Sequence, residues 1–228
     1  MKFNEFKNMA QLSMEEICRD TFRKNQNSIK IKKEAVAVKN LAAIFHTTLR
    51  LSNEKGFQTM SLRELSRASG LSMGALYSYF TSKDELLEMI QEQGRRLILK
   101  IMTTVIDMEA PAAEKLQAAI RGHLYLTEVM QPWFYFSYME TKNLDKRRQK
   151  KAIEGERATE KLFIDILEEG IRRHDFRVAD PVLTASLLKA MLQDWYLKRW
   201  KYAGRRISVD QYADFLIGFM ESAIRPEA

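Results

Sequence analysis

The sequence contains few cysteines, prolines and glycines, and each shortage excludes a class of protein. Cys18 is the only cysteine among 228 residues, so neither an intramolecular disulfide nor a cysteine-based metal cluster can form. Four prolines and nine glycines, without regularly spaced strand patterns between turn signals, argue against a β-sandwich or barrel. No window approaches the roughly 18 apolar residues of a membrane span, and the first twenty residues lack the apolar run of a signal peptide. We therefore expect an all-α protein of the reducing cytoplasm, with no metal, no cofactor and no membrane partner.

The positive charge is concentrated in the N-terminal third of the chain. Residues 1–83 contain fourteen Lys and Arg against seven Asp and Glu, whereas residues 84–228 contain twenty-three of each. A basic module joined to a neutral body indicates a polyanionic partner such as nucleic acid. From charge alone, a solvated basic surface is an equally good interpretation.

Helix start signals divide the chain into three parts. Ser followed three residues later by Glu or Gln, which is the capping-box pattern, recurs before several apolar repeats, and Asp180 before Pro181 is another helix start. These signals predict helices over residues 13–25, 34–54, 61–68, 72–80, 82–106, 111–130, 144–173, 181–202 and 208–224. We expect an extension with a short helix and a basic arm (1–33), a three-helix DNA-binding domain with a helix-turn-helix (34–83), and a larger helical domain for effector binding and dimerisation (84–228).

Two short predicted helices around Ser69-Gly70-Leu71 have the pattern of a helix-turn-helix. The apolar positions that would hold it together are Leu62, Leu65, Ala68, Leu71, Leu76 and Phe80. The residues left facing outward would be Met73, Gly74, Ala75, Tyr77, Ser78 and Tyr79. Small residues allow a helix to approach base edges closely, and tyrosine hydroxyls can bind phosphates. The alternative is that the two helices merely pack together.

The same region resembles the DNA-binding signature of the TetR family of bacterial transcriptional regulators. Residues 56–87 read GFQTMSLRELSRASGLSMGALYSYFTSKDELL. The resemblance implies a homodimer on a palindromic double-stranded operator, usually repressing and released by a small ligand. By position it implies base or sugar contacts from Arg63, Met73, Gly74, Ala75 and Tyr79, and phosphate contacts from Ser61, Tyr77 and Lys83. Tyr79 departs from the family pattern, which often has histidine there.

About 35 residues precede the first helix of the expected DNA-binding domain, which is longer than is usual in the family. Within this extension, Lys30, Lys32 and Lys33 could lie along phosphates or in a minor groove, as basic arms do. The alternative is a helix packed on the body, followed by a solvated linker.

The C-terminal two thirds contain no catalytic motif, neither a Gly-rich phosphate loop nor a nucleophile elbow, so we do not expect an enzyme. Polar-tipped aromatic residues and methionines around Pro132 predict a pocket for a mainly apolar effector. Its candidate lining residues are Tyr125, Met130, Phe134, Tyr138, Met191 and Trp195. The simpler interpretation is that most of them are core residues.

A basic-aromatic stretch, WYLKRWKYAGRR at residues 195–206, resembles segments of acyl-CoA-responsive TetR regulators and makes an acyl-CoA-like effector conceivable. Its alternative role is to complement a helix dipole. By the same resemblance, the last two helices would form the homodimer. The expected contact residues are Leu187, Leu188, Met191, Phe215, Leu216, Phe219 and Met220.

The sequence therefore predicts a ligand-responsive dimeric repressor. Two rivals remain: a DNA-binding regulator controlled by a protein partner or by no effector, and a helical enzyme or carrier with an incidental helix-turn-helix.

Overall fold

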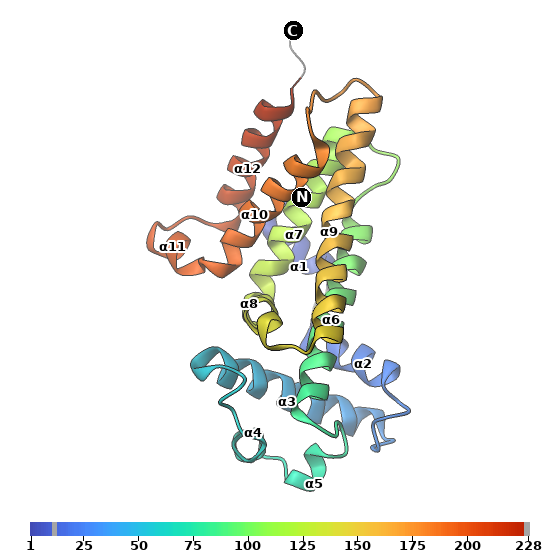
Figure 1. Ribbon diagram of the computed structural model, residues 1–228, viewed down its shortest axis with the longest axis vertical. Coiled ribbons are helices and arrows are strands. Elements are labelled where there is room, and N and C mark those ends of the chain that lie inside the picture. The colour runs from blue at the N-terminus through green and yellow to red at the C-terminus, as the bar shows by residue number, and fades with distance from the viewer. Residues whose placement is uncertain (11–12, 226–228) are drawn as a thin grey trace. The chain divides into compact units, whose positions relative to one another are not determined.

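All regular structure in the computed structural model, which describes residues 1–10 and 13–225, is helical (Figure 1). The helices are α1 (Phe3–Ala10), α2 (Met14–Lys24), α3 (Glu34–Lys55), α4 (Leu62–Ser69), α5 (Met73–Leu76), α6 (Lys83–Val105), α7 (Ala112–Val129), α8 (Gln131–Glu140), a 3-10 turn η1 (Thr141–Asn143), α9 (Lys146–Arg172), α10 (Pro181–Leu197), α11 (Arg199–Gly204) and α12 (Val209–Ile224). The all-α prediction is thus confirmed. None of the described helices combines the length and apolarity needed to cross a bilayer.

The helix boundaries follow the capping residues. The Ser61 hydroxyl accepts a hydrogen bond from the Glu64 backbone N–H, and the Glu64 carboxylate accepts one from the Ser61 backbone N–H. Ser208 and Gln211 form the same reciprocal box before α12. Asp180 caps α10, whose first residue is Pro181. These side chains satisfy N–H groups that the first helical turn leaves without partners.

Four elements differ from the predicted helices, and one of them is α8 (Gln131–Glu140), where no helix was predicted. Residues 3–10 form α1, for which the sequence showed no start signal. Helical hydrogen bonding in α5 ends at Leu76 rather than Phe80. The helix expected over residues 181–202 is interrupted at Lys198, which divides α10 from α11.

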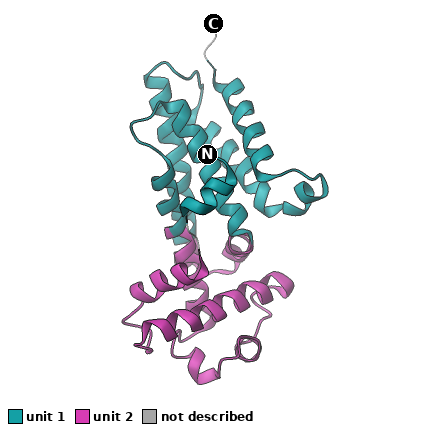
Figure 2. Cartoon of the chain, turned by 180° about the vertical axis from the view of Figure 1, so that it is seen from behind, with its two compact units in different colours: residues 1–10, 97–131, 151–228 teal, residues 11–96, 132–150 magenta. Residues whose placement is uncertain are grey.

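Two compact units make up the described chain (Figure 2). Unit 1 contains residues 1–10, 97–131 and 151–228, and unit 2 contains residues 11–96 and 132–150. These boundaries differ from the expected ones at 33/34 and 83/84, because tertiary packing assigns α1 to unit 1 and α8 to unit 2. Helices α6 and α9 each contribute residues to both units.

Unit 2 is organised around α3. Leu41 and Phe45 of α3 are fully buried, and α2 packs on α3 through Ile17, Cys18 and Phe22. Helix α8 adds Trp133, whose ring meets that of Phe45 edge-on at 5.5 Å and whose indole N–H donates to the Ile90 carbonyl at 3.0 Å.

Unit 1 is organised around α7, which packs against α1, α10 and α12. The indole N–H of Trp195 donates to the Glu128 carboxylate at 3.0 Å, and the Arg199 guanidinium binds the same carboxylate at 2.9 and 3.0 Å. Tyr125 lies against the rings of Phe3 and Phe6 and donates to Asp210 at 2.5 Å. Helix α1 is therefore held to the start of α12 as well as to α7.

Candidate nucleic-acid interface

The turn between α4 and α5 is built by local hydrogen bonds and two buried leucines. Gly70 adopts a left-handed conformation with φ of 71° and ends α4. The Ser66 hydroxyl donates to the Leu71 carbonyl at 2.6 Å, and the Ser72 hydroxyl accepts from the Ala75 backbone at 3.1 Å. Leu65 and Leu76 are fully buried. These contacts fix α5 relative to α4, as a helix-turn-helix requires.

The exposed side of α5 carries the small residues that the sequence placed there. Gly74 is exposed, Met73 and Ala75 are half-buried, and Tyr77 is 42% exposed directly after the helix. A Cβ added at Gly74 would meet only the Ser72 hydroxyl, at 4.0 Å. The fold of the chain therefore does not require glycine at this position.

Tyr79 and Ala68 do not take the positions expected for them. Tyr79 is only 1% exposed, so the prediction that it faces outward is wrong. Beyond Leu76 the backbone forms a 3-10-type turn, in which the Tyr79 N–H donates to the Leu76 carbonyl three residues back. In such a turn, side chains three residues apart lie on the same face. Tyr79 thus follows Leu76 into the core, where burial raises the pKa of its hydroxyl and the Asn40 side chain partly offsets the rise. Ala68 is exposed and not at a helix crossing.

Lys83 is oriented by contacts within unit 2. Its ammonium donates to the Gln58 carbonyl at 2.9 Å and lies 4.8 Å from the centre of the Phe57 ring. Burial lowers the pKa of Lys83, while the charges of Glu140, Asp84 and Glu64 act in the opposite direction. These two contacts hold the half-buried ammonium in one place, six residues after Tyr77.

Three cations lie in or near α4: Lys55 is paired with Glu64, whereas Arg63 and Arg67 are not paired within the described part of the chain. Lys55 and the Ser61 backbone and hydroxyl bind the Glu64 carboxylate and lower its pKa to about 2. Arg63 and Arg67 are exposed and form no ion pair among the described residues. Arg67, in the last turn of α4, is a candidate DNA contact that the sequence analysis did not select, although its place just before the turn was a usable signal. The Ser61 hydroxyl is exposed but already engaged by Glu64.

The six residues predicted to line an effector pocket are not gathered in one unit. Phe134 and Tyr138 belong to unit 2, and Tyr138 is half exposed. Tyr125, Met130 and Trp195 are buried in unit 1, and the polar atoms of Tyr125 and Trp195 are already hydrogen-bonded to carboxylates. Only Met191 lines the groove described next. For Tyr125, Met130 and Trp195, the core interpretation is the better one.

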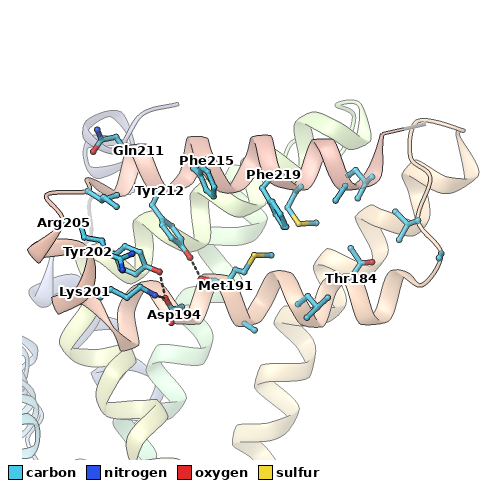
Figure 3. A pocket seen from close by; sticks show the side chains of 18 of the residues that line it. Thr184, Met191, Asp194, Lys201, Tyr202, Arg205, Gln211, Tyr212, Phe215 and Phe219 are labelled. Carbon is cyan, nitrogen blue, oxygen red and sulfur yellow. Dashed lines mark hydrogen bonds and ion pairs between the residues drawn. The ribbon is translucent and has the colours of Figure 1, made fainter. Parts of the chain in front are cut away.

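A groove of about 1100 Å³ lies between α10 and α12 (Figure 3). Met191 faces it from α10, and Phe215 and Phe219 face it from α12. At one end, Asp194 binds Lys201 at 2.5 Å and accepts from the Tyr202 hydroxyl. Burial acts to raise the pKa of Asp194, but hydrogen bonds from Lys198, Lys201 and Tyr202 outweigh it, so the net shift is downward.

The basic-aromatic stretch at residues 195–206 is largely satisfied within unit 1. Lys198 and Lys201 pair with Asp194, and Arg199 pairs with Glu128. Arg205 lines the groove, and Arg206 is exposed. Most of these cations therefore stabilise the junction of α10 and α11.

The expected dimer residues divide into two sets. Leu188, Leu216 and Met220 are buried in the core of the chain itself, so they are not free to form a contact surface. Leu187, Phe215 and Phe219 are 67%, 74% and 52% exposed, and Met191 is half-buried in the groove. Leu183, which the sequence analysis did not select, is also exposed. Helices α10 and α12 thus present large apolar side chains to the outside of unit 1, and Leu187, Phe215 and Phe219 among them also line the groove.

Comparisons with known proteins agree with this architecture. The protein-family model described as bacterial regulatory proteins, tetR family, matches residues 44–90, and the model described as tetracyclin repressor-like, C-terminal domain, matches residues 109–223. The HTH-type transcriptional repressor KstR2 of Mycobacterium tuberculosis is 24% identical over 192 residues, covering 76% of this chain and 87% of that protein.

Two solved structures share the fold. A bacterial regulatory protein of the tetR family from Rhodococcus RHA1 aligns with a TM-score of 0.76 at 19% identity, covering 83% of this chain and 98% of that one. AibR in complex with isovaleryl coenzyme A and operator DNA aligns with a TM-score of 0.70 at 21% identity, covering 79% of this chain and 97% of that one.

Proposed function

This chain belongs to the TetR family of bacterial regulatory proteins, and we propose that it is a dimeric repressor of transcription that binds a palindromic double-stranded DNA operator in the cytoplasm. The observation that carries this proposal is the exposed face of α5. Gly74 is exposed there although the fold does not require glycine, Tyr77 is exposed directly after the helix, and Arg63 and Arg67 are free of ion pairs among the described residues. Small residues, a hydroxyl and unpaired guanidinium groups match base edges and phosphates.

Dimerisation explains how such a short reading helix binds specifically. Helix α5 has only four residues, so one copy reaches few bases. Two copies joined through α10 and α12 would present two reading helices to two half-sites about one helical turn of DNA apart. The second half-site is then bound at a high effective concentration, which raises the overall affinity.

Release would follow from a ligand that favours another spacing of the two reading helices. We infer a mainly apolar effector with an anionic end, because the groove has Met191, Phe215 and Phe219 on its walls and, at one end, Arg205, which forms no ion pair among the described residues. The operator complex of AibR contains isovaleryl coenzyme A, which joins a short apolar acyl group to a larger anionic part. Helices α6 and α9 have residues in both units, so they could transmit a conformational change from the groove in unit 1 to the reading helix in unit 2.

Selection of genomic DNA fragments by the purified protein tests the proposal. We expect enrichment of a palindromic sequence by the wild type and loss of that enrichment in a Tyr77→Phe, Lys83→Gln variant that remains folded. A wild-type protein that enriches no sequence contradicts the proposal, and so does a double variant with unchanged enrichment. Saturated and unsaturated acyl-CoA thioesters added to the bound operator then test release.

A DNA-binding regulator controlled by a protein partner is the second candidate. The exposed apolar residues of α10 and α12 favour it, because such a face suits a protein as well as a small molecule. Failure of all thioesters and free fatty acids to release the operator or to raise the melting temperature would favour this candidate.

A further inference from the structure

The segment between α2 and α3 is a fixed loop rather than a free arm. Helix α2 is packed on α3 through Ile17, Cys18 and Phe22, so both ends of residues 25–33 are anchored. Within the loop, the backbone N–H groups of Ser28 and Ile29 donate to the Asn25 carbonyl at 3.0 and 2.9 Å. The Asn25 side chain donates to the Thr21 carbonyl at 2.7 Å. This loop was expected to be a basic arm or a solvated linker, and its hydrogen bonds give it a defined shape.

The loop is seated against the end of the reading helix. The side chain of Ile29 is fully buried, and the backbone N–H of the next residue, Lys30, donates to the Ser78 carbonyl at 2.8 Å. Ser78 directly follows the exposed Tyr77, whose hydroxyl is a proposed phosphate contact. The basic loop and the DNA-reading segment of unit 2 are therefore neighbours in space although about 45 residues separate them in the sequence.

The lysines of this loop have no acidic partners in the described chain, whereas two arginines of the preceding helix α2 do. Lys30, Lys32 and Lys33 are exposed and form no ion pair among the described residues; the Lys32 ammonium donates to the Gln26 carbonyl at 3.2 Å. By contrast, Arg19 and Arg23 of α2 both bind the Glu34 carboxylate at 3.3 Å. Three exposed lysines within four residues of the chain add up to a local positive potential that attracts anions.

We propose that Lys30, Lys32 and Lys33 form a second DNA-binding site, which holds phosphates of the duplex next to the groove read by α5. The inference rests on the proposed function, because it takes its ligand from the helix-turn-helix beside it. Since the loop is already ordered by Ile29 and the Ser78 contact, binding costs little conformational entropy. Lysine contacts to phosphate carry no base information, so the site adds affinity for every sequence and depends strongly on salt.

Substitution of the lysines is a better test than removal of the extension, because removal would take away α2 and expose the apolar side of α3. The test variant is Lys30→Gln, Lys32→Gln, Lys33→Gln. The control changes three exposed cations of unit 1 and has the same net charge: Lys100→Gln, Lys161→Gln, Arg172→Gln. Circular dichroism melts check that both remain folded. Fluorescence anisotropy measures binding to a short labelled duplex over a series of KCl concentrations.

Each phosphate contact contributes about 0.9 to the slope of log K against log salt. Since a dimer has two loops, we expect the test variant to reduce the slope by about 2 to 5 relative to the control, with equal loss of affinity on operator and scrambled duplexes. A difference below about 1.8, which is one contact per protomer, overturns the proposal. A loss confined to the operator overturns it as well, because phosphates are the same in both duplexes. Wild-type protein that binds no duplex refutes the proposed function instead, which separates the two failures.

Discussion

Two tyrosines separated by one residue have opposite environments after α5. Tyr77 is 42% exposed and Tyr79 is 1% exposed, because the tight turn after Leu76 places Tyr79 on the buried side. In Tyr77→Phe we expect unchanged thermal stability and DNA binding weaker by about 1.5 to 3 kcal/mol per half-site, the value of a hydrogen bond to a charged group. In Tyr79→Phe we expect unchanged DNA binding. Anisotropy titrations of both variants decide: a Tyr79→Phe loss as large as that of Tyr77→Phe would contradict the buried position of Tyr79.

Substitutions of Gly74 can distinguish an effect on DNA binding from an effect on folding. Because a Cβ would meet only the Ser72 hydroxyl at 4.0 Å and alanine is favoured over glycine in helices by up to about 1 kcal/mol, we expect Gly74→Ala to be at least as stable as the wild type. Gly74→Leu should also fold. DNA affinity should fall from Gly to Ala to Leu as the added bulk keeps α5 away from the bases. Equal affinity for all three proteins, measured beside their melting temperatures, would show that α5 does not approach DNA at Gly74.

At the scale of helices, the sequence predicts features that depend on neighbouring residues, but not features that depend on packing between distant segments. Ser61 with Glu64 and Asp180 with Pro181 mark helix starts because the bonds that they make lie within a few residues. The residues of α1 carry no such signal, since that helix is held by Tyr125 and Asp210 from distant parts of the chain. The same distinction applies to the DNA-binding residues. The exposure of Gly74 and Tyr77 follows from the local pattern of α5, whereas the position of the basic loop depends on the burial of Ile29 and on the hydrogen bond from Lys30 to Ser78, which lies far away in the sequence.

The contact between α7 and α10 contains a buried histidine that gives a pH prediction. His123 lies fully buried in α7, its Nε2 atom is 3.5 Å from the Lys189 ammonium of α10, and burial together with that charge lowers its pKa well below the ordinary value of 6.5. The unfolded chain therefore binds a proton near pH 6.5 that the folded chain does not bind. The free energy of unfolding should fall as the pH drops below about 6.5, by about 1.4 kcal/mol per pH unit from this group.

Urea denaturation at pH 7, 6 and 5 measures this contribution. In His123→Gln we expect a weaker pH dependence, by up to one proton, because the titrating group has been removed. A His123→Gln protein with the same pH dependence as the wild type would contradict a depressed pKa at His123.

At the scale of the whole molecule, dimerisation can be tested by substituting residues of α10 and α12 that are exposed in the single chain, because these substitutions leave the core unchanged. Leu187 and Phe215 are 67% and 74% exposed in the single chain, so charged residues there should leave the fold intact. A second copy would cover both, and burying unpaired carboxylates is costly. We therefore expect Leu187→Glu, Phe215→Glu to be a folded monomer in analytical ultracentrifugation under conditions in which the wild type is a dimer.

The control is Met108→Glu, which introduces a single carboxylate at a residue that is 70% exposed in the loop before α7, and it should remain dimeric. The monomeric variant should also lose operator binding far more strongly than binding to scrambled duplex, because specific binding requires two half-sites at once. A monomer that retains wild-type affinity for the operator would show that one α5 with its basic loop is sufficient. A wild-type monomer at micromolar concentration would instead leave the apolar face of α10 and α12 to a different protein, as the second candidate function requires.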